Sequence, residues 1–79
     1  MDPLIGASAH RHGIADDDIR HALHNAIHIW ELDDGIDIYI GPAYDGTLLE
    51  IGLAVADAGQ LIVVHAMKAR PKYLRRKKR

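Results

Sequence analysis

The sequence predicts an α+β domain with one or two N-terminal helices packed on one face of a four-stranded antiparallel meander sheet, followed by a basic C-terminal tail. Apolar residues recur at helical spacing early in the chain and at every second position from residue 27 onward. A glycine marks each break between the alternating segments, as tight hairpins require. The chain has 79 residues, enough for one hydrophobic core, so we expect a single domain over 1–79.

A helix is predicted over residues 16–26. After the helix-stopping Gly13, one stripe of this helix would carry Ile14, Ile19, Leu23 and Ile27. Three consecutive aspartates lie in its first turn, where negative charge complements the positive end of the helix dipole. Residues 1–9 show no clear periodicity, and we expect either a flexible N-terminal arm or a short helix there.

Four segments with alternating apolar residues predict the strands, over about 27–30, 36–40, 49–55 and 61–69. The hairpins that align these segments best place Ile38 opposite both Ile29 and Ile51, and Leu53 opposite Val64. One aliphatic face would then be buried against the helix, consisting of Ile36, Ile38, Ile40, Leu49, Ile51, Leu53, Val55, Ile62 and Val64.

The opposite face of this sheet is predicted to be open, and it gathers His28, Trp30, Asp37, Tyr39, Glu50, His65 and Met67. The pairing sets Glu50 opposite Tyr39 and Met67, with His65 on the adjacent diagonal. Open antiparallel faces are normally polar, so a plain solvated surface is the alternative for any one of these residues. As a group they exceed what solvation requires.

The composition excludes several classes of protein and site. The absence of cysteine rules out disulfides, thiolate metal ligands and a thiol nucleophile. No apolar run approaches the ~20 residues of a membrane span, and the N-terminus lacks the regions of a signal peptide. We therefore expect a cytoplasmic protein without membrane contact. Because so small a domain is near the lower limit of independent stability, a partner protein is also expected.

The formal net charge of −1 conceals a separation of charge along the chain. Through Met67 there are two basic and eleven acidic residues, a formal charge of −9, whereas residues 68–79 include eight basic residues and no acidic one. The basic tail itself is taken as 70–79. Such a block of charge favours contact with a polyanion or an acidic protein surface, and a solvated tail is the alternative.

Two residues of the open face are suited to acid–base chemistry on RNA. Cleavage through the 2′-hydroxyl needs a base, an acid for the leaving 5′-oxygen, and cations for the charged phosphorane. Glu50 and His65 can share the first two tasks near neutral pH. Arg70 can bind a phosphate bidentately, and Lys72 adds a point charge. This type of reaction needs no metal ion and no other cofactor.

Aromatic and basic residues extend the expected contact with RNA. Three aromatic rings can stack unpaired bases, worth ~1–3 kcal/mol per base, and these are Trp30, Tyr39 and Tyr73. The basic residues expected to bind RNA are Lys68, Lys72, Arg75 and Arg76.

Two pairs of histidines raise the question of a metal site. His10 and His12 are two positions apart, and His21 and His24 share one face of the predicted helix. No carboxylate or cysteine completes either pair at a suitable spacing. We therefore expect surface histidines and no metal site.

Three stretches of the chain resemble BrnT-like toxins within the broader RelE-type ribonuclease superfamily. Residues 64–74 resemble the C-terminal signature of that family, in which a last strand leads into closely spaced Arg, Lys and aromatic residues. Residues 12–14 (His-Gly-Ile) resemble the step between its two helices, and residues 38–41 with 47–49 resemble its paired strands. The chain departs from the pattern at its N-terminus, which lacks a Phe-x-Trp-Asp strand, and at Thr47, where the family has arginine.

The resemblance implies that this chain is the toxin of a type II toxin–antitoxin system, acting as a metal-independent mRNA endoribonuclease that an antitoxin protein neutralises. It implies RNA, free or ribosome-bound, as the substrate. Together with the acid–base chemistry above, the predicted catalytic set is Glu50, His65, Arg70 and Tyr73. A homodimer or a hetero-oligomer with the antitoxin is the expected assembly. The alternative is a non-catalytic module that binds RNA or an acidic protein through the same face and tail.

Overall fold

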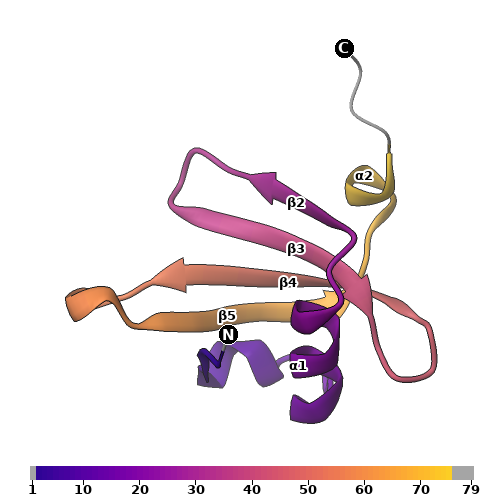
Figure 1. Ribbon diagram of the computed structural model, residues 1–79, viewed down its shortest axis with the longest axis horizontal. Helices are drawn as coiled ribbons and strands as arrows, with labels where there is room; N and C mark the ends of the chain where they lie inside the picture. The colour runs from indigo at the N-terminus through magenta and orange to yellow at the C-terminus, as the bar shows by residue number, and fades with distance from the viewer. Residues whose placement is uncertain (1, 76–79) are drawn as a thin grey trace.

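The computed structural model describes residues 2–75, and Figure 1 shows their arrangement. In chain order the elements are β1 (Leu4–Ile5), η1 (Ala7–His10), α1 (Asp16–His24), β2 (His28–Glu31), β3 (Ile36–Pro42), β4 (Leu48–Val55), η2 (Asp57–Gly59), β5 (Leu61–Lys68) and α2 (Pro71–Leu74), where η marks a 3-10 helix. The predicted α+β class is confirmed.

The sheet has the strand order β1-β5-β4-β3-β2. Strands β2 to β5 form an antiparallel meander, as the alternating segments predicted. The prediction of only four strands is wrong, because β1 pairs in parallel with β5 through Leu4 opposite Ile62. The N-terminal segment predicted as an arm or a short helix therefore holds both a strand and the short helix η1. A two-residue strand has no alternation that a sequence can reveal.

Helix α1 lies close to the range predicted for it, and it begins at Asp16 and ends at His24. Its buried side chains are Ile19, Ala22 and Leu23, and it packs against β3 and β4. Among residues 2–75, no helix has the length and apolar character needed to cross a membrane.

The register of β3 differs by one residue from the prediction. Tyr39 lies opposite Ile51, where the prediction placed Ile38. The reason lies at Gly41, where α1 passes so close that a Cβ atom would collide with the carbonyl group of Ala22. Gly41 must therefore face the helix, and the two-residue period of the strand brings Tyr39 to the same side.

This shift exchanges residues between the two faces of the sheet. Tyr39 packs at the margin of the helix-side core, so the prediction that it shares a face with Glu50 is wrong. Ile36, Ile38 and Ile40 were predicted to face the helix and instead lie on the Glu50 face. Ile38 and Ile40 are 4% and 1% exposed. The Glu50 face is therefore apolar and covered around these residues, and it is not the open surface that was predicted.

A β-bulge interrupts the pairing of β4 with β5. Gly52 lies opposite His65 on one side of the bulge, and Leu53 lies opposite Val63 on the other. Val64 is thus the extra residue on β5, and the predicted pairing of Leu53 with Val64 is wrong. A bulge re-aims the side chains that flank it, and this one turns Val63 to the helix side of the sheet, whereas His65 shares the face of Glu50 through regular alternation from Met67.

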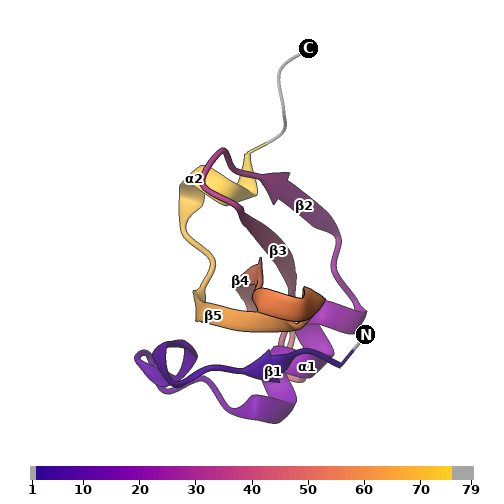
Figure 2. The same cartoon turned by 90° about the vertical axis from the view of Figure 1, so that its left-hand side faces the viewer.

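The main core lies between the helix side of the sheet and the elements α1 and η1, and consists of Ala9, Ile19, Ala22, Leu23, Ala43, Leu49, Ile51, Leu53, Val63 and Ala66. Val55 was predicted to be buried but is 66% exposed, because it ends β4. Ile62 and Val64 are only partly buried. Figure 2 shows that the C-terminal segment with α2 lies on the far side of the sheet from α1.

Candidate functional site

A buried carboxylate organises the Glu50 face of the sheet. Glu50 is 0% exposed, and each of its oxygens accepts two hydrogen bonds. Oε1 accepts from the backbone N–H and the Nε of Arg70, both at 2.9 Å. Oε2 accepts from Nη2 of Arg70 at 2.7 Å and from Nε2 of His65 at 2.8 Å. We refer to Glu50, His65 and Arg70 as the Glu50 cluster.

The local chain path brings the three residues together. Glu50 lies in the middle of β4, opposite Met67. Gly52 allows the close approach of His65 across the pair, since a Cβ atom at Gly52 would lie 2.9 Å from the Cβ of His65. Beyond β5, the backbone N–H of Ala69 bonds to the Leu48 carbonyl at 2.9 Å, which keeps the chain beside β4 and carries Arg70 over the carboxylate.

The charges of the Glu50 cluster stabilise one another. Burial alone would raise the pKa of Glu50, but the side-chain and backbone hydrogen bonds from Arg70, followed by that from His65, hold this pKa below its ordinary value of 4.5. The hydrogen bond to Glu50 in turn raises the pKa of Arg70. The carboxylate is therefore ionised at neutral pH. Its four acceptor positions are all occupied, so Glu50 has no free lone pair for a proton from a substrate.

His65 has an imidazole nitrogen that the cluster leaves unengaged. Its side chain is 29% exposed, and its Nε2 lies against Glu50. Because a carboxylate only accepts hydrogen bonds, Nε2 carries the proton, and in the neutral ring Nδ1 holds the lone pair. Arg70 is more exposed, at 46% of its side chain. The imidazole of His65 and the guanidinium of Arg70 are thus both accessible to solvent, whereas the carboxylate of Glu50 that binds them is buried.

A second histidine, His12, borders the cluster. The centres of the His12 and His65 rings are 6.0 Å apart, with the rings edge to face. The segment that carries His12 is fastened to β5 by two bonds, from Gly6 N to the Val63 carbonyl at 2.9 Å and from Ser8 Oγ to the Val64 carbonyl at 2.7 Å. From its sequence position alone His12 is predicted to be a surface histidine, because no spacing rule connects it to β5.

Helix α2 gathers the remaining predicted residues near the cluster. The guanidinium carbon of Arg70 and the Nζ of Lys72 lie 5.6 Å and 4.9 Å from the centre of the Tyr73 ring. Trp30 donates from Nε1 to the Tyr73 carbonyl at 3.0 Å, and its ring lies edge-on to those of Tyr73 and His28. Trp30 therefore braces α2 in this structure, in addition to the stacking role predicted for it.

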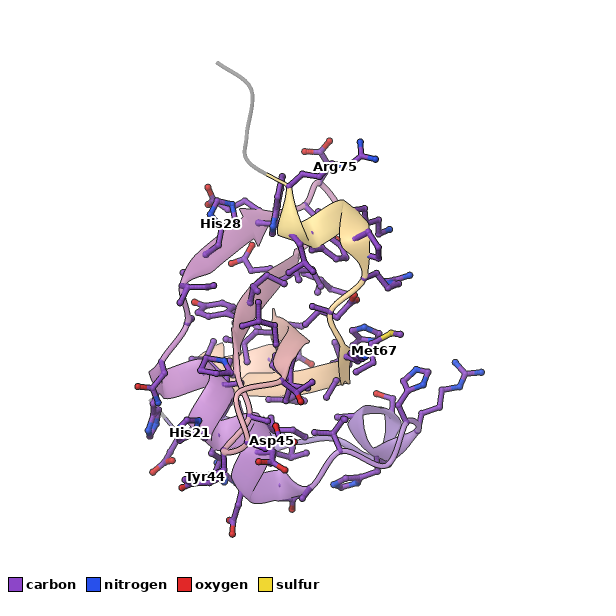
Figure 3. The ribbon with its side chains drawn as sticks, turned by 90° about the vertical axis from the view of Figure 1, so that its right-hand side faces the viewer. His21, His28, Tyr44, Asp45, Met67 and Arg75 are labelled. Carbon is purple, nitrogen blue, oxygen red and sulfur yellow. The ribbon has the colours of Figure 1, made fainter. Side chains whose placement is uncertain are left out.

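Some predicted RNA-binding residues lie away from the cluster. Tyr39 is on the helix side of the sheet, and Lys68 lies opposite Leu49 on that same side. Arg75 is exposed just beyond α2, where Figure 3 labels it. Arg76 lies outside the described residues.

Two other histidines, His10 and His21, have separate local partners. His10 Nε2 lies 2.7 Å from Asp16 Oδ1, and His21 donates from Nδ1 to the Pro42 carbonyl at 2.8 Å. His21 also packs against the Tyr44 ring, at the end of the molecule away from Arg75 (Figure 3). Among residues 2–75, no group of three or more His, Asp or Glu side chains has the geometry to hold a metal ion.

No family model matches the chain, and comparisons with curated proteins and with solved structures found no match. The geometry of the site is therefore the basis for assigning a function.

Proposed function

We propose that this protein is the toxin of a type II toxin–antitoxin system, that it cleaves mRNA in the cytoplasm without a metal cofactor, and that an antitoxin protein neutralises it. The observation that carries the proposal is the Glu50 cluster, in which a buried carboxylate holds a partly exposed imidazole beside a guanidinium. A base fixed by a carboxylate and an adjacent cation are what attack by a 2′-hydroxyl on its own phosphodiester requires.

His65 is the general base in this proposal. Glu50 fixes the tautomer with the proton on Nε2, so Nδ1 accepts the proton of the 2′-hydroxyl. The 2′-oxygen bonds to phosphorus, the bond from phosphorus to the 5′-oxygen breaks, and a 2′,3′-cyclic phosphate remains. Glu50 stabilises the imidazolium that forms. Arg70 stabilises the phosphorane with the guanidinium N–H groups that Glu50 does not engage.

His12 is the proposed general acid. It is exposed, and the centre of its ring lies 6.0 Å from that of His65. An imidazolium at this position can protonate the leaving 5′-oxygen while His65 takes the proton from the 2′-hydroxyl. The sequence predicts that Glu50 shares this acid–base role with His65. Because its carboxylate is ionised and fully bonded, the proposal gives Glu50 the task of positioning His65 and Arg70 instead.

The purified full chain is expected to cleave single-stranded RNA in the presence of a chelator and to leave 2′,3′-cyclic phosphate ends. The reason is that the nucleophile is the substrate's own 2′-hydroxyl. Mass spectrometry of the products identifies the ends, and expression of the chain without a partner should arrest growth. An RNA carrying 2′-O-methyl groups throughout is the control and should stay intact. Cleavage that stops with the chelator, or that occurs on the methylated RNA, would contradict the mechanism.

The basic tail is expected to make RNA binding dependent on salt. The slope of log affinity against log salt should be roughly −0.7 per phosphate neutralised. Deleting residues 76–79 removes four basic residues, so the slope should become less steep by at most roughly 3. A chain in which the same four residues are serine controls for length. If the slope does not change, the tail contacts solvent or a protein rather than RNA.

A non-catalytic module that binds RNA or a protein is the second candidate. Two observations favour it: the carboxylate of Glu50 is fully engaged, and the C-terminal segment covers part of the sheet face. A module of this kind requires Arg70 for binding and is indifferent to His65. RNA binding and cleavage by Arg70→Ala and His65→Ala therefore separate the two functions.

A further inference from the structure

The outer edge of β2 presents apolar side chains that the fold does not cover. β2 ends the strand order and pairs only with β3, so within residues 2–75 its other edge carries no strand (Figure 1). Ile27, Ile29 and Leu32, in or beside this strand, are 67%, 43% and 36% exposed. Helix α1 packs mainly against β3 and β4. We call residues 27–34 together with Asp37 the β2 edge surface.

The β2 edge surface is also acidic. Glu31 and Asp37 lie directly opposite each other on neighbouring strands, on the same face as Ile29. Like charges in directly opposed positions destabilise a sheet. Asp33 and Asp34, in the turn between the strands, are exposed as well. Within residues 2–75, no Lys or Arg forms an ion pair with Glu31 or Asp37. The fold thus tolerates a repulsion that a cation from another molecule would relieve.

We infer that the β2 edge surface binds a protein partner through an extended segment that adds to the sheet beside β2 and carries, at every second position, apolar residues followed by Lys or Arg, so that both kinds of side chain lie on the face of Ile29 and Glu31. An open strand edge accepts a new strand through main-chain hydrogen bonds. Apolar side chains of that segment cover Ile27 and Ile29, and its cations neutralise Glu31 and Asp37. The same acidic charge repels RNA, and it disfavours pairing with the β2 of a second copy.

The inference rests on the proposed function only for the identity of the partner, an antitoxin. The binding is measured on the isolated full chain without RNA, so a failure of binding and a failure of cleavage are distinguishable. The probe is an eight-residue capped peptide with valine at two successive alternate positions, lysine or arginine at the next two alternate positions, and threonine at the positions between them. A second peptide of the same sequence, N-methylated at alternate residues, keeps the charge but cannot form the strand ladder.

The first peptide is expected to shift the backbone amide resonances of residues 27–32 and 37–40 of the labelled chain, and the N-methylated peptide is not. The double variant Glu31→Gln/Asp37→Asn should bind the peptide about tenfold more weakly, the effect of losing two partly exposed ion pairs. It should unfold at the same or a higher temperature, because the opposed charges are gone. Asp17→Asn/Asp57→Asn, which removes the same charge from exposed positions elsewhere, should change affinity by less than about twofold.

Four results would overturn the inference. Shifts centred on other elements would place the binding surface elsewhere. Equal losses in the two double variants, or equal binding of the N-methylated peptide, would show general attraction between opposite charges rather than strand addition. Self-association that competes with the peptide and disappears in Glu31→Gln/Asp37→Asn would show that a second copy occupies this edge.

Discussion

Replacing His65 by alanine is expected to lower the rate of RNA cleavage by ~10²–10⁴, the usual contribution of one general base, while the chain remains folded and still binds RNA. His65 is partly exposed and supplies one of the four hydrogen bonds to Glu50, and the three from Arg70 remain in the variant. Single-turnover cleavage of an RNA oligonucleotide measures the effect, and circular dichroism checks the fold.

His24→Ala is a matched control, since His24 is exposed on α1 and lies outside the proposed machinery. It should cleave at the wild-type rate. His12→Ala should instead slow cleavage, because it removes the group proposed to protonate the leaving 5′-oxygen. A His65→Ala chain that cleaves at the wild-type rate and still arrests growth would eliminate the proposed base and favour the binding module.

Replacing Glu50 by alanine is expected to destabilise the fold by about 2–4 kcal/mol, a large part of the stability of a small domain. The change removes a fully buried side chain and leaves a cavity, and the backbone N–H of Arg70 loses its hydrogen-bond acceptor. The expected loss of unfolding free energy is smaller than for breaking a fully buried ion pair, because the side chains of Arg70 and His65 are both partly exposed to water. Urea unfolding measures it. Asp57→Ala, at an exposed acidic position, should change the free energy of unfolding by less than about 0.5 kcal/mol.

The same residue makes stability depend on pH in a defined direction. The pKa of Glu50 in the folded chain is below 4.5, so its interactions stabilise the fold above pH 4.5, and this contribution is lost as the pH falls below that value. Glu50→Gln should show a shallower loss of stability on acidification than the wild type. It should also slow cleavage, because an amide N–H facing His65 favours the wrong tautomer. An identical acid dependence in the two chains would contradict the charged, bonded state of Glu50.

Much of the candidate site follows from the sequence, because β4 and β5 alternate without ambiguity. The predicted pairs Glu50 with Met67 and Ile51 with Ala66 are confirmed. These pairs alone place His65 near Glu50, and the end of β5 then brings Arg70 to the same place. What alternation cannot indicate is that Glu50 becomes inaccessible. Its burial depends on the return of the chain after β5, a tertiary contact that short-range patterns do not encode.

The register of β3 was not predictable in the same way. Both alternating sets of this strand have a residue suited to a core, the isoleucines on one side and Tyr39 on the other, so hydrophobicity alone does not decide which set faces the helix. The packing distance decides it, because only Gly41 admits the backbone of α1. The position of His12 beside His65 was not predictable for a related reason. The N-terminal segment that carries His12 is far from β5 in the sequence, and a tertiary contact brings the two together.

The short parallel strand β1 limits how many molecules can assemble by adding strands to this sheet. It occupies the outer edge of β5 with only two residues, and the chain then turns back, through Gly6 and Ser8, onto β5 itself. That edge of the sheet therefore has few backbone groups with which a strand from another molecule could form hydrogen bonds, and short, covered edge strands protect many natural sheets in this way. Filaments need two complementary edges on every subunit. A molecule with one usable edge takes a single added strand and then stops, which favours a finite complex of fixed stoichiometry over open-ended polymerisation.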